Sequence, residues 1–339
     1  MKKKIIVAAV AAAMVAPMAA MADATVYGKI RVATQYHDRD ATNADAWGLV
    51  DHSSRLGIKG SEDLGNGLKA VYKMEFGVNV GEGYGKSSFW SQRNSYVGLA
   101  GGWGTFLVGK HDTPFKISSG KLDFFADTAA DYDGSSLGVA GSGKGVGLFH
   151  SLRVDGAIAY ISPSMAGFTV AGAIVQTNVK GGFEDADDFM SAYSLAAMYS
   201  NGPFFGSLAY ENIDPQSLVG APAGASDFSK WRLGLGVLGM SGFSASFIYE
   251  DRSDYDFAGL DGDSWQIQGA YDFGNNRVKA MYGELDWDGT GSGGYDSWAI
   301  GLAHSFSKRT SAEVLYRQAD ADNTSGEDDV FALQLNHSF

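Results

Sequence analysis

The side chains in this sequence that could do chemistry are charged groups rather than nucleophiles or metal ligands. The chain has no cysteine, and none of its six histidines stands at metal-ligand spacing from another. These histidines are His37, His52, His111, His150, His304 and His337. No Ser/His/Asp arrangement is indicated either. The sequence therefore predicts no enzyme, no cofactor and no metal site.

Two glycine-containing stretches come close to ligand-binding motifs, and each lacks a ligand residue. Residues 138–145 read GVAGSGKG, a phosphate-loop spacing with Gly145 where the Mg²⁺-binding Ser or Thr belongs. The stretch from Asp131 to Gly134 resembles a calcium loop, but Ala129 replaces its first ligand. We interpret both as ordinary loop sequence.

Acidic and basic residues occupy different kinds of segment. Many acids gather in stretches without alternation, among them Glu184, Asp185, Asp187, Asp188, Asp251, Asp254, Asp256, Asp261, Asp263, Asp286, Asp288, Asp320, Asp322, Glu327, Asp328 and Asp329. Lys29, Arg55 and Arg153 instead lie in alternating segments, out of phase with the apolar residues. Arg93 is ambiguous, because Val97 and Leu99 share its parity. The basic residues are thus expected on the polar faces of strands.

The N-terminus has the features of an export signal. Three lysines precede an apolar run that ends before Ala20-Met21-Ala22, which predicts a signal peptide over residues 1–22 and a mature chain over 23–339. Loss of those lysines would take the formal net charge from −13 to about −16. Such an acidic, exported chain is not expected to bind nucleic acid. Without cysteine, it must rely on a large core or a closed sheet.

The rest of the chain repeats one pattern: a segment of about ten residues with period-2 alternation, followed by a turn or loop. We count sixteen such segments. In the last one Phe331, Leu333, Leu335 and Phe339 alternate with small or polar residues. Seven short turns, at 62–67, 100–104, 162–167, 200–203, 239–242, 272–276 and 307–310, alternate with longer loops. One strand face suits hydrocarbon and the other suits water.

These features predict an all-β fold, a sixteen-stranded antiparallel transmembrane β-barrel. Proline supports it: Pro114, Pro163, Pro203, Pro215 and Pro222 all fall in predicted turns or loops. Aromatic pairs such as Phe243 and Tyr249 lie on the outward face of single strands, as two interfacial girdles require. The alternative is a soluble, exported β-sandwich or a periodic solenoid. It is disfavoured because the polar faces are rich in small residues and arginine.

The mature chain resembles the general diffusion porins of the Gram-negative outer membrane. The resemblance rests on residues 26–29 (VYGK), 54–60 (SRLGIKG) and 93–99 (RNSYVGL) and on the C-terminal Phe339. It implies a homotrimer in the cell outer membrane whose third loop folds into the lumen, here residues 111–146. Phe339 would then be the signal read by the barrel assembly machinery. Gly28, Gly57 and Gly98, which we assign to outward faces, would permit close trimer packing.

The resemblance also implies two charged walls at the pore constriction. Lys29, Arg55, Arg93 and Arg153 match the basic side. Asp123, Asp127, Asp131 and Asp133 match the acidic side. Leu122 stands where the family usually has proline, and Asp123 where it usually has glutamate.

Such facing charges create a transverse field that favours small hydrophilic solutes and ions over apolar ones. We therefore expect a channel for passive diffusion, surrounded by outer-membrane lipid and lipopolysaccharide. The acids in the long loops would enrich cations, which predicts weak cation selectivity. A solute-specific channel and a surface adhesin or phage-receptor barrel remain as alternatives.

Overall fold

The computed structural model describes residues 24–39, 45–81, 89–133, 146–176, 190–214, 227–255, 260–288, 293–322 and 327–339. In these ranges the chain forms strands and one short helix, α2 (Pro114–Ser119). The strands are β1 (Thr25–Arg39), β2 (Ala46–Asp51), β3 (Arg55–Gly65), β4 (Leu68–Val78), β5 (Trp90–Gly101), β6 (Gly104–Asp112), β7 (Arg153–Ile161), β8 (Phe168–Val175), β9 (Ala192–Asn201), β10 (Phe204–Ile213), β11 (Phe228–Met240), β12 (Phe243–Tyr255), β13 (Leu260–Phe273), β14 (Asn276–Trp287), β15 (Tyr295–Ser305), β16 (Thr310–Ala321) and β17 (Glu327–Ser338). The predicted signal peptide lies outside the described residues.

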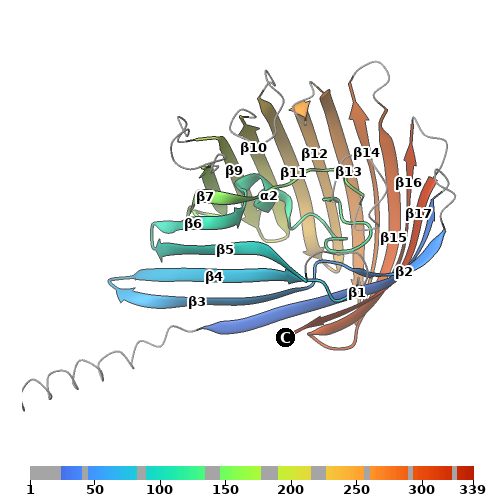
Figure 1. Ribbon diagram of the computed structural model, residues 1–339, viewed down its shortest axis with the longest axis horizontal. Helices are drawn as coiled ribbons and strands as arrows, with labels where there is room; N and C mark the ends of the chain where they lie inside the picture. The colour runs from blue at the N-terminus through green and yellow to red at the C-terminus, as the bar shows by residue number, and fades with distance from the viewer. Residues whose placement is uncertain are drawn as a thin grey trace, which may run out of the picture.

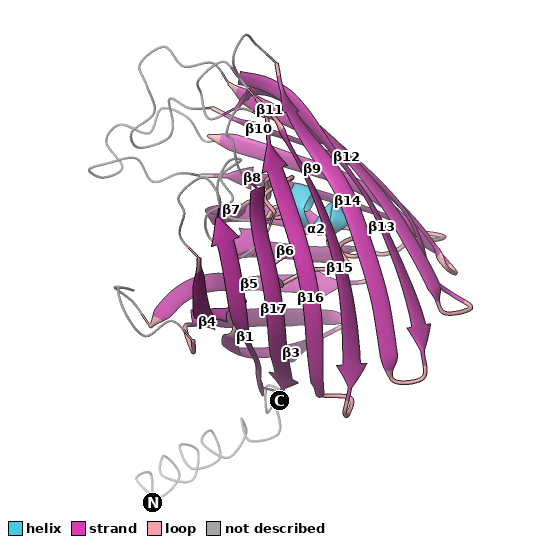
Figure 2. Ribbon diagram, turned by 90° about the vertical axis from the view of Figure 1, so that its right-hand side faces the viewer, coloured by secondary structure: helices cyan, strands magenta, loops and turns pink. Residues whose placement is uncertain are grey.

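The strands form a single closed antiparallel sheet (Figures 1 and 2). Apart from β2 and β3, each strand pairs with the next along the chain, and β1 pairs with β17, from Lys29 opposite Ser338 to Arg39 opposite Asp328. β2 and β3 both pair with β1, one with each half of it. Together they make one interrupted strand of the barrel, so the barrel has the sixteen strands that the sequence predicts.

The interruption between β2 and β3 has a local cause. Ser53 has a positive φ of 63°, which no regular strand allows. The backbone N–H of Ser54 donates to the Asp51 carboxylate at 2.9 Å, closing a tight side-chain turn. Because the break involves only polar residues with local hydrogen bonds, apolar alternation did not reveal it.

Apolar and polar side chains are placed opposite to the arrangement in a soluble protein. On β17, Leu333 and Leu335 are 51% and 57% exposed, whereas Gln334 between them is 1% exposed. The largest fully buried side chains include Arg232 and Arg317. This confirms the parity predicted for the terminal strand, with an outer face suited to hydrocarbon and a polar inner face.

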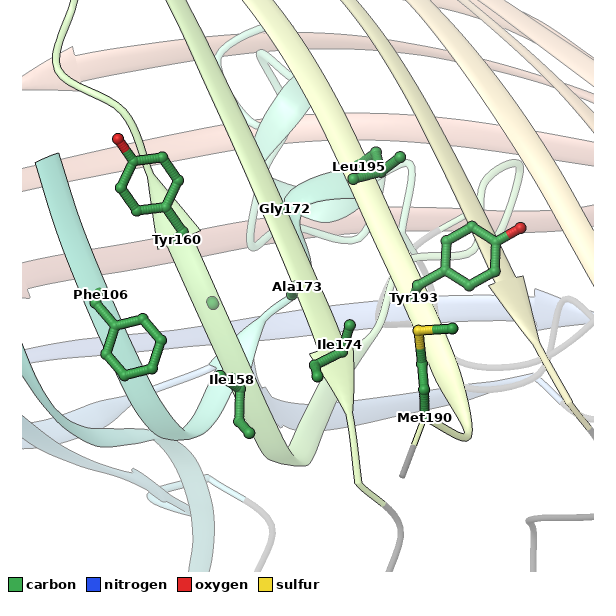
Figure 3. Close-up of a pocket in the computed structure, with 10 residues that line it drawn as sticks. Phe106, Ile158, Tyr160, Gly172, Ala173, Ile174, Met190, Tyr193 and Leu195 are labelled. Carbon is green, nitrogen blue, oxygen red and sulfur yellow. The ribbon is translucent and has the colours of Figure 1, made fainter. Parts of the chain in front are cut away.

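The outer face also carries a shallow apolar groove over β6 to β9 (Figure 3). Its volume is about 510 Å³, and Phe106, Tyr160, Ile174 and Leu195 are among its lining residues. No ionisable side chain other than those of tyrosines lines it. Separately, no helix in the described ranges is long and apolar enough to cross a membrane.

The seven predicted short turns are confirmed, but several strands run further than the alternation suggested. β12 continues to Tyr255, β13 begins at Leu260, and β14 continues to Trp287. In this extension Asp251 pairs in register with Asp263, which also pairs with Asp286. Beyond the hydrocarbon layer an outward residue need not be apolar, so the pattern stops before the strand does.

A β-bulge resolves the parity of Arg93. Met74 is opposite Ser95 and Phe76 is opposite Gln92, so Arg93 and Asn94 together face Glu75. The extra residue reverses the alternation, which lets Arg93 point inward although Val97 and Leu99 point outward.

Two of the three glycines assigned to outward faces are in fact inward. A Cβ on Gly57 would lie 2.5 Å from the Tyr27 ring, and the Tyr27 hydroxyl donates to the Glu75 carboxylate inside the barrel. Gly98 alternates with exposed Val97 and so lies on the inner face. Gly28 is outward, where the Phe339 ring covers it. Small size at Gly57 therefore admits a ring into the barrel rather than a neighbouring subunit.

The position-dependent cost of charge on the outer face gives a direct test. Leu333→Arg places a cation in the hydrocarbon, so the free energy of unfolding should fall by about 2–4 kcal/mol. Phe306→Arg, in the β15–β16 turn at the rim, should cost about 0–1 kcal/mol. Urea unfolding in lipid bilayers measures both, and equal costs would contradict the assigned orientation.

Candidate functional site

The segment between β6 and β7 lies against the inner faces of the barrel strands. α2 opens it, with Pro114 at its first position and the Thr113 hydroxyl accepting the Lys116 N–H at 3.3 Å. Figures 1 and 2 show α2 within the ring of strands. Further along, the backbone carbonyl of Phe124 accepts from Lys279 of β14 at 2.8 Å, and that of Val146 accepts from Tyr295 of β15. We call residues 113–133 and 146–152 the inner segment.

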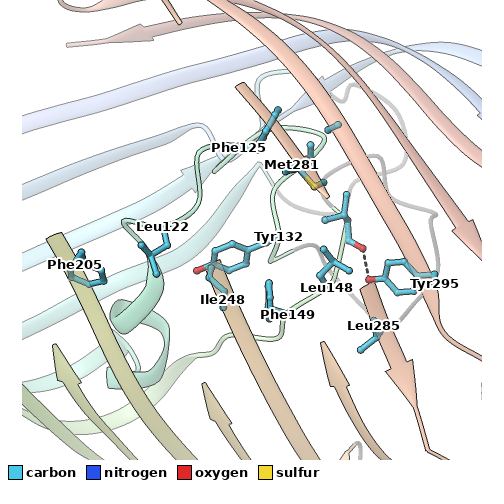
Figure 4. Close-up of a cluster of buried hydrophobic side chains, with 13 residues drawn as sticks. Leu122, Phe125, Tyr132, Leu148, Phe149, Phe205, Ile248, Met281, Leu285 and Tyr295 are labelled. Carbon is cyan, nitrogen blue, oxygen red and sulfur yellow. Dashed lines mark hydrogen bonds between the residues drawn. The ribbon is translucent and has the colours of Figure 1, made fainter. Parts of the chain in front are cut away.

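An apolar cluster attaches the inner segment to the wall (Figure 4). The segment contributes Leu122, Phe125, Tyr132, Leu148 and Phe149, all buried. The wall contributes Phe205, Ile248, Met281, Leu285 and Tyr295 from β10, β12, β14 and β15. This is where the apolar core of the molecule sits, inside an otherwise polar barrel.

Asp127 of the inner segment makes ion pairs with three basic residues of the barrel wall. Its carboxylate lies 2.6 Å from Arg55, 3.4 Å from Arg31 and 3.8 Å from Lys29. Its carbonyl accepts from Arg31 at 3.0 Å, and its N–H donates to Asp131 at 2.6 Å. The φ of Asp127 is +56°, a conformation that aspartate tolerates better than most residues. These contacts join the segment to β1 and β3.

The other two predicted basic residues have different partners. Arg93 donates to Glu75 of β4 at 2.8 Å, and Lys73 lies 3.1 Å from the same side chain. Arg153 lies 2.9 Å from Asp112. The structure therefore brings Lys29 and Arg55 to the inner segment, whereas Arg93 and Arg153 pair with acids of the β4–β7 wall.

The predicted acids divide in a similar way. Asp133 makes an ion pair with Lys116 at 2.5 Å. Asp131 accepts the N–H groups of Asp127 and Asp133, and Asp123 accepts that of Phe125 at 2.8 Å. Asp123 and Asp131 thus bond the inner segment to itself and face none of the four predicted basic residues.

Protonation of these acids is expected to differ. Burial raises the pKa of Asp123 to about 6, although hydrogen bonds to its carboxylate oppose the shift. Burial, with the adjacent Asp123 carboxylate, raises the pKa of Asp131 well above its ordinary value. Burial would also raise the pKa of Asp127, but Arg55, Arg31 and Lys29 outweigh it and lower that pKa. Of these three carboxyl groups, Asp127 is therefore the one whose surroundings favour the charged form.

Sequence reasoning missed charged residues that contact the same segment. Arg31 shares the inward face of Lys29, so strand parity alone could have found it. Arg232 contacts Glu250 and donates to the Ser119 hydroxyl at 2.7 Å. Arg252 also pairs with Glu250 and donates to the Leu148 carbonyl. Arg232 alternates with apolar Trp231 and Leu233, whereas Arg252 lies between Asp251 and Ser253. Their partners in the inner segment are more than a hundred residues away in the sequence, so no local pattern indicated these contacts.

Phe339 closes the seam between the first and last strands. The N–H of Gly28 donates to the Phe339 carbonyl at 3.0 Å, and the Phe339 N–H donates to the Gly28 carbonyl at 3.1 Å. A Cβ on Gly28 would lie 2.2 Å from the Phe339 ring. The terminal residue therefore completes the ladder and covers the adjacent strand.

The accessible charges on this wall are predominantly positive. Lys29, Arg31 and Arg55 surround one carboxylate, and each of their side chains is between 16% and 27% exposed. Lys73 and Arg93 likewise share Glu75. In the described part of the chain, no group of three or more His, Asp or Glu residues could hold a metal ion. The arrangement thus places partly exposed cations along the wall of β1, β3, β4 and β5.

Asp123→Asn should remove a pH dependence of stability. Because the pKa is raised in the folded chain, the proton on Asp123 stabilises the fold below about pH 4, and this contribution is lost as the pH rises to about 6. The native thermal midpoint should therefore fall between pH 4 and 7, and fall less in the variant. Asp155→Asn, at an exposed carboxylate, should keep the native dependence. Identical profiles for all three proteins would contradict the assignment.

Comparisons with known proteins agree with this architecture. The chain is 29% identical over 343 residues to the major outer membrane protein P.IB of Neisseria gonorrhoeae, covering 93% of this chain and 92% of that protein. An anion-selective porin from Comamonas acidovorans has a similar structure, with a TM-score of 0.75 at 21% identity over 94% of this chain and all of that one. The trimer form of OmpT from Vibrio cholerae matches with a TM-score of 0.66 at 15% identity, over 93% of this chain and 99% of that one. The Gram-negative porin family model matches residues 8–324, so the chain belongs to the Gram-negative porins, β-barrel channels of the outer membrane.

Proposed function

We propose that this porin is a general channel for passive diffusion of small hydrophilic solutes and ions, narrowed by the inner segment. The observation that carries the proposal is the contact of Asp127 with Lys29, Arg31 and Arg55, which joins the segment to the wall through accessible charges. Apolar solutes would have to displace ordered water there without replacing its hydrogen bonds. The expected alternatives are a solute-specific channel and an adhesin or phage receptor.

The same contacts lead us to revise the predicted residues on both the basic and the acidic side of the constriction. We assign Lys29, Arg31 and Arg55 to the basic side at the narrowest point, and Arg93 and Arg153 to the adjoining wall. Asp127 and Asp133 provide the acidic side. Asp123 and Asp131 instead shape the inner segment, because their carboxylates accept its own N–H groups.

The acids of the long loops and the cations of the wall would influence the ion preference in opposite directions. The sequence predicts weak cation selectivity from acids in the long loops, five of which (Glu184, Asp185, Asp187, Asp188 and Asp256) lie outside the described residues. The described wall supports the other sign, because three cations surround one carboxylate at Asp127 and two share Glu75. The narrowest point dominates selectivity, where low-dielectric walls concentrate the field. We therefore propose a modest anion preference.

The remaining partners follow from the family and the outward face. We infer a homotrimer, since the name of a similar structure, OmpT of Vibrio cholerae, describes a trimer form. The exposed apolar faces suit outer-membrane lipid and lipopolysaccharide. We also propose that residues 1–22 are removed on export and that the assembly machinery recognises Phe339.

Planar-bilayer recordings test the function. The native protein should give ohmic steps that do not saturate with salt and are not blocked by any one solute. Block by one sugar or anion would favour a solute-specific channel, and no conductance would favour the surface-interaction role. Under a salt gradient the reversal potential should show anion preference. Arg31→Gln with Arg55→Gln should shift it toward cations, whereas Arg309→Gln, at an exposed position of the β15–β16 turn, should not. A cation preference in the native protein would overturn the proposed sign.

A further inference from the structure

Four glycines on the inner wall lie beneath the inner segment, and backbone conformation does not explain them. They are Gly234 and Gly236 on β11, Gly283 on β14 and Gly301 on β15. None has a positive φ, so an L-residue could adopt each backbone conformation. What distinguishes them is the space that a Cβ would occupy.

The pair on β11 holds the side chain of Leu122. A Cβ on Gly234 would lie 2.6 Å from one Leu122 methyl and 2.6 Å from the Ser207 hydroxyl of the wall. A Cβ on Gly236 would lie 2.6 Å from the other Leu122 methyl and no closer than 3.4 Å to any wall atom. Leu122 is fully buried, and its carbonyl accepts from the Ser246 hydroxyl at 2.7 Å. Each methyl is thus confined by one glycine, and rotating the side chain away from one brings it against the other.

The same arrangement recurs at two other points. A Cβ on Gly283 would lie 2.6 Å from a Leu148 methyl, and one on Gly301 would lie 3.2 Å from the Phe125 ring. Leu148 and Phe125 are also fully buried. Leu122, Phe125 and Leu148 of the inner segment therefore each contact a wall position that has no side chain, although wall atoms also crowd the last two positions, including the Trp265 carbonyl 2.6 Å from a Cβ on Gly283.

We propose that Gly234 and Gly236 are positioning residues of the channel, which set how deeply the inner segment seats on the wall and hence how wide the lumen is. The inference rests on the proposed channel function. An alanine at either position would need the Leu122 methyl to retreat by about 1 Å to reach an ordinary contact. Since Leu122 is enclosed, the segment must move inward, which narrows the lumen.

Single-channel conductance tests the proposal. Gly234→Ala and Gly236→Ala should each lower the conductance by roughly a fifth or more, because a shift of about 1 Å is large for a narrow pore. Gly206→Ala and Gly269→Ala, on the outward faces of β10 and β13, are controls for an added methyl group that meets no close neighbour. A Cβ on Gly206 has its nearest atom at 3.8 Å, and one on Gly269 has none within 4 Å. Both controls should conduct as the native protein does, and a similar loss in all four would overturn the proposal.

Removing the opposing side chain provides a rescue. Leu122→Ala in the Gly236→Ala background restores the space, so the conductance should return to at least the native level. Leu122→Phe, with both glycines unchanged, should lower the conductance as Gly234→Ala and Gly236→Ala do. If the conductance of Gly236→Ala stayed low after Leu122→Ala was added, the glycine would act through something other than its contact with Leu122.

Thermal unfolding in detergent micelles separates this proposal from the channel function. Gly236→Ala and Leu122→Ala should each lower the midpoint, and the double variant should lose clearly less than the two losses combined. If the native protein failed to conduct, the proposed function would be wrong. The non-additive losses in the thermal midpoint would still test the contact between Gly236 and Leu122. If the two losses in the thermal midpoint were additive, the proposed role of Gly236 in positioning Leu122 would be contradicted, whatever the conductance.

Discussion

The constraint on which the structure depends is that no backbone N–H or C=O can be left unpaired in hydrocarbon. A sheet meets it only by closing on itself, which here means pairing β1 with β17. The closing contact extends to the last residue, through the reciprocal hydrogen bonds of Gly28 and Phe339. Once the ring is closed, successive residues must alternate between lipid and lumen. The outward faces become apolar and the lumen receives the charges.

A polar lumen creates a second problem, because charged side chains become crowded as the inner segment covers them. The structure solves it by pairing nearly every buried charge it encloses. Glu250 accepts from Arg232 and Arg252, which also bond the backbone of the segment. Breaking such a pair on one side would leave an uncompensated charge, so these contacts specify position more than they add stability. The cations near Asp127 are paired too, but each keeps part of its side chain exposed.

Much of this could be predicted from the sequence, for physical reasons. Period-2 alternation is imposed by the lipid at every strand, so the strand count, the short turns and the face of Leu333 followed directly. The alternation fails where the lipid stops or the backbone departs from regular pairing. The acidic ends of β12 to β14, the break at Ser53 and the bulge at Arg93 are three such cases.

The candidate site was harder to predict than the barrel. Resemblance and parity placed Lys29, Arg55 and Asp127 together, and the structure brings them into contact. Asp123 and Asp131 have the same residue type and segment as Asp127, yet their roles depend on which N–H groups the folded segment presents to them. The seat of Leu122 depends on glycines more than a hundred residues away. Contacts between distant segments leave no periodic signal.

The central claim is that the polar faces of this barrel line a water-filled path. The chain has no cysteine, so single cysteines report their own surroundings without background. We would measure the current through single-cysteine variants in a bilayer while adding a charged, water-soluble thiosulfonate reagent. Cysteine at Lys29 or Lys73 should react and change the current, whereas cysteine at Leu333 or Leu335 should not. Reaction at the leucine positions, with none at the lysine positions, would contradict the account.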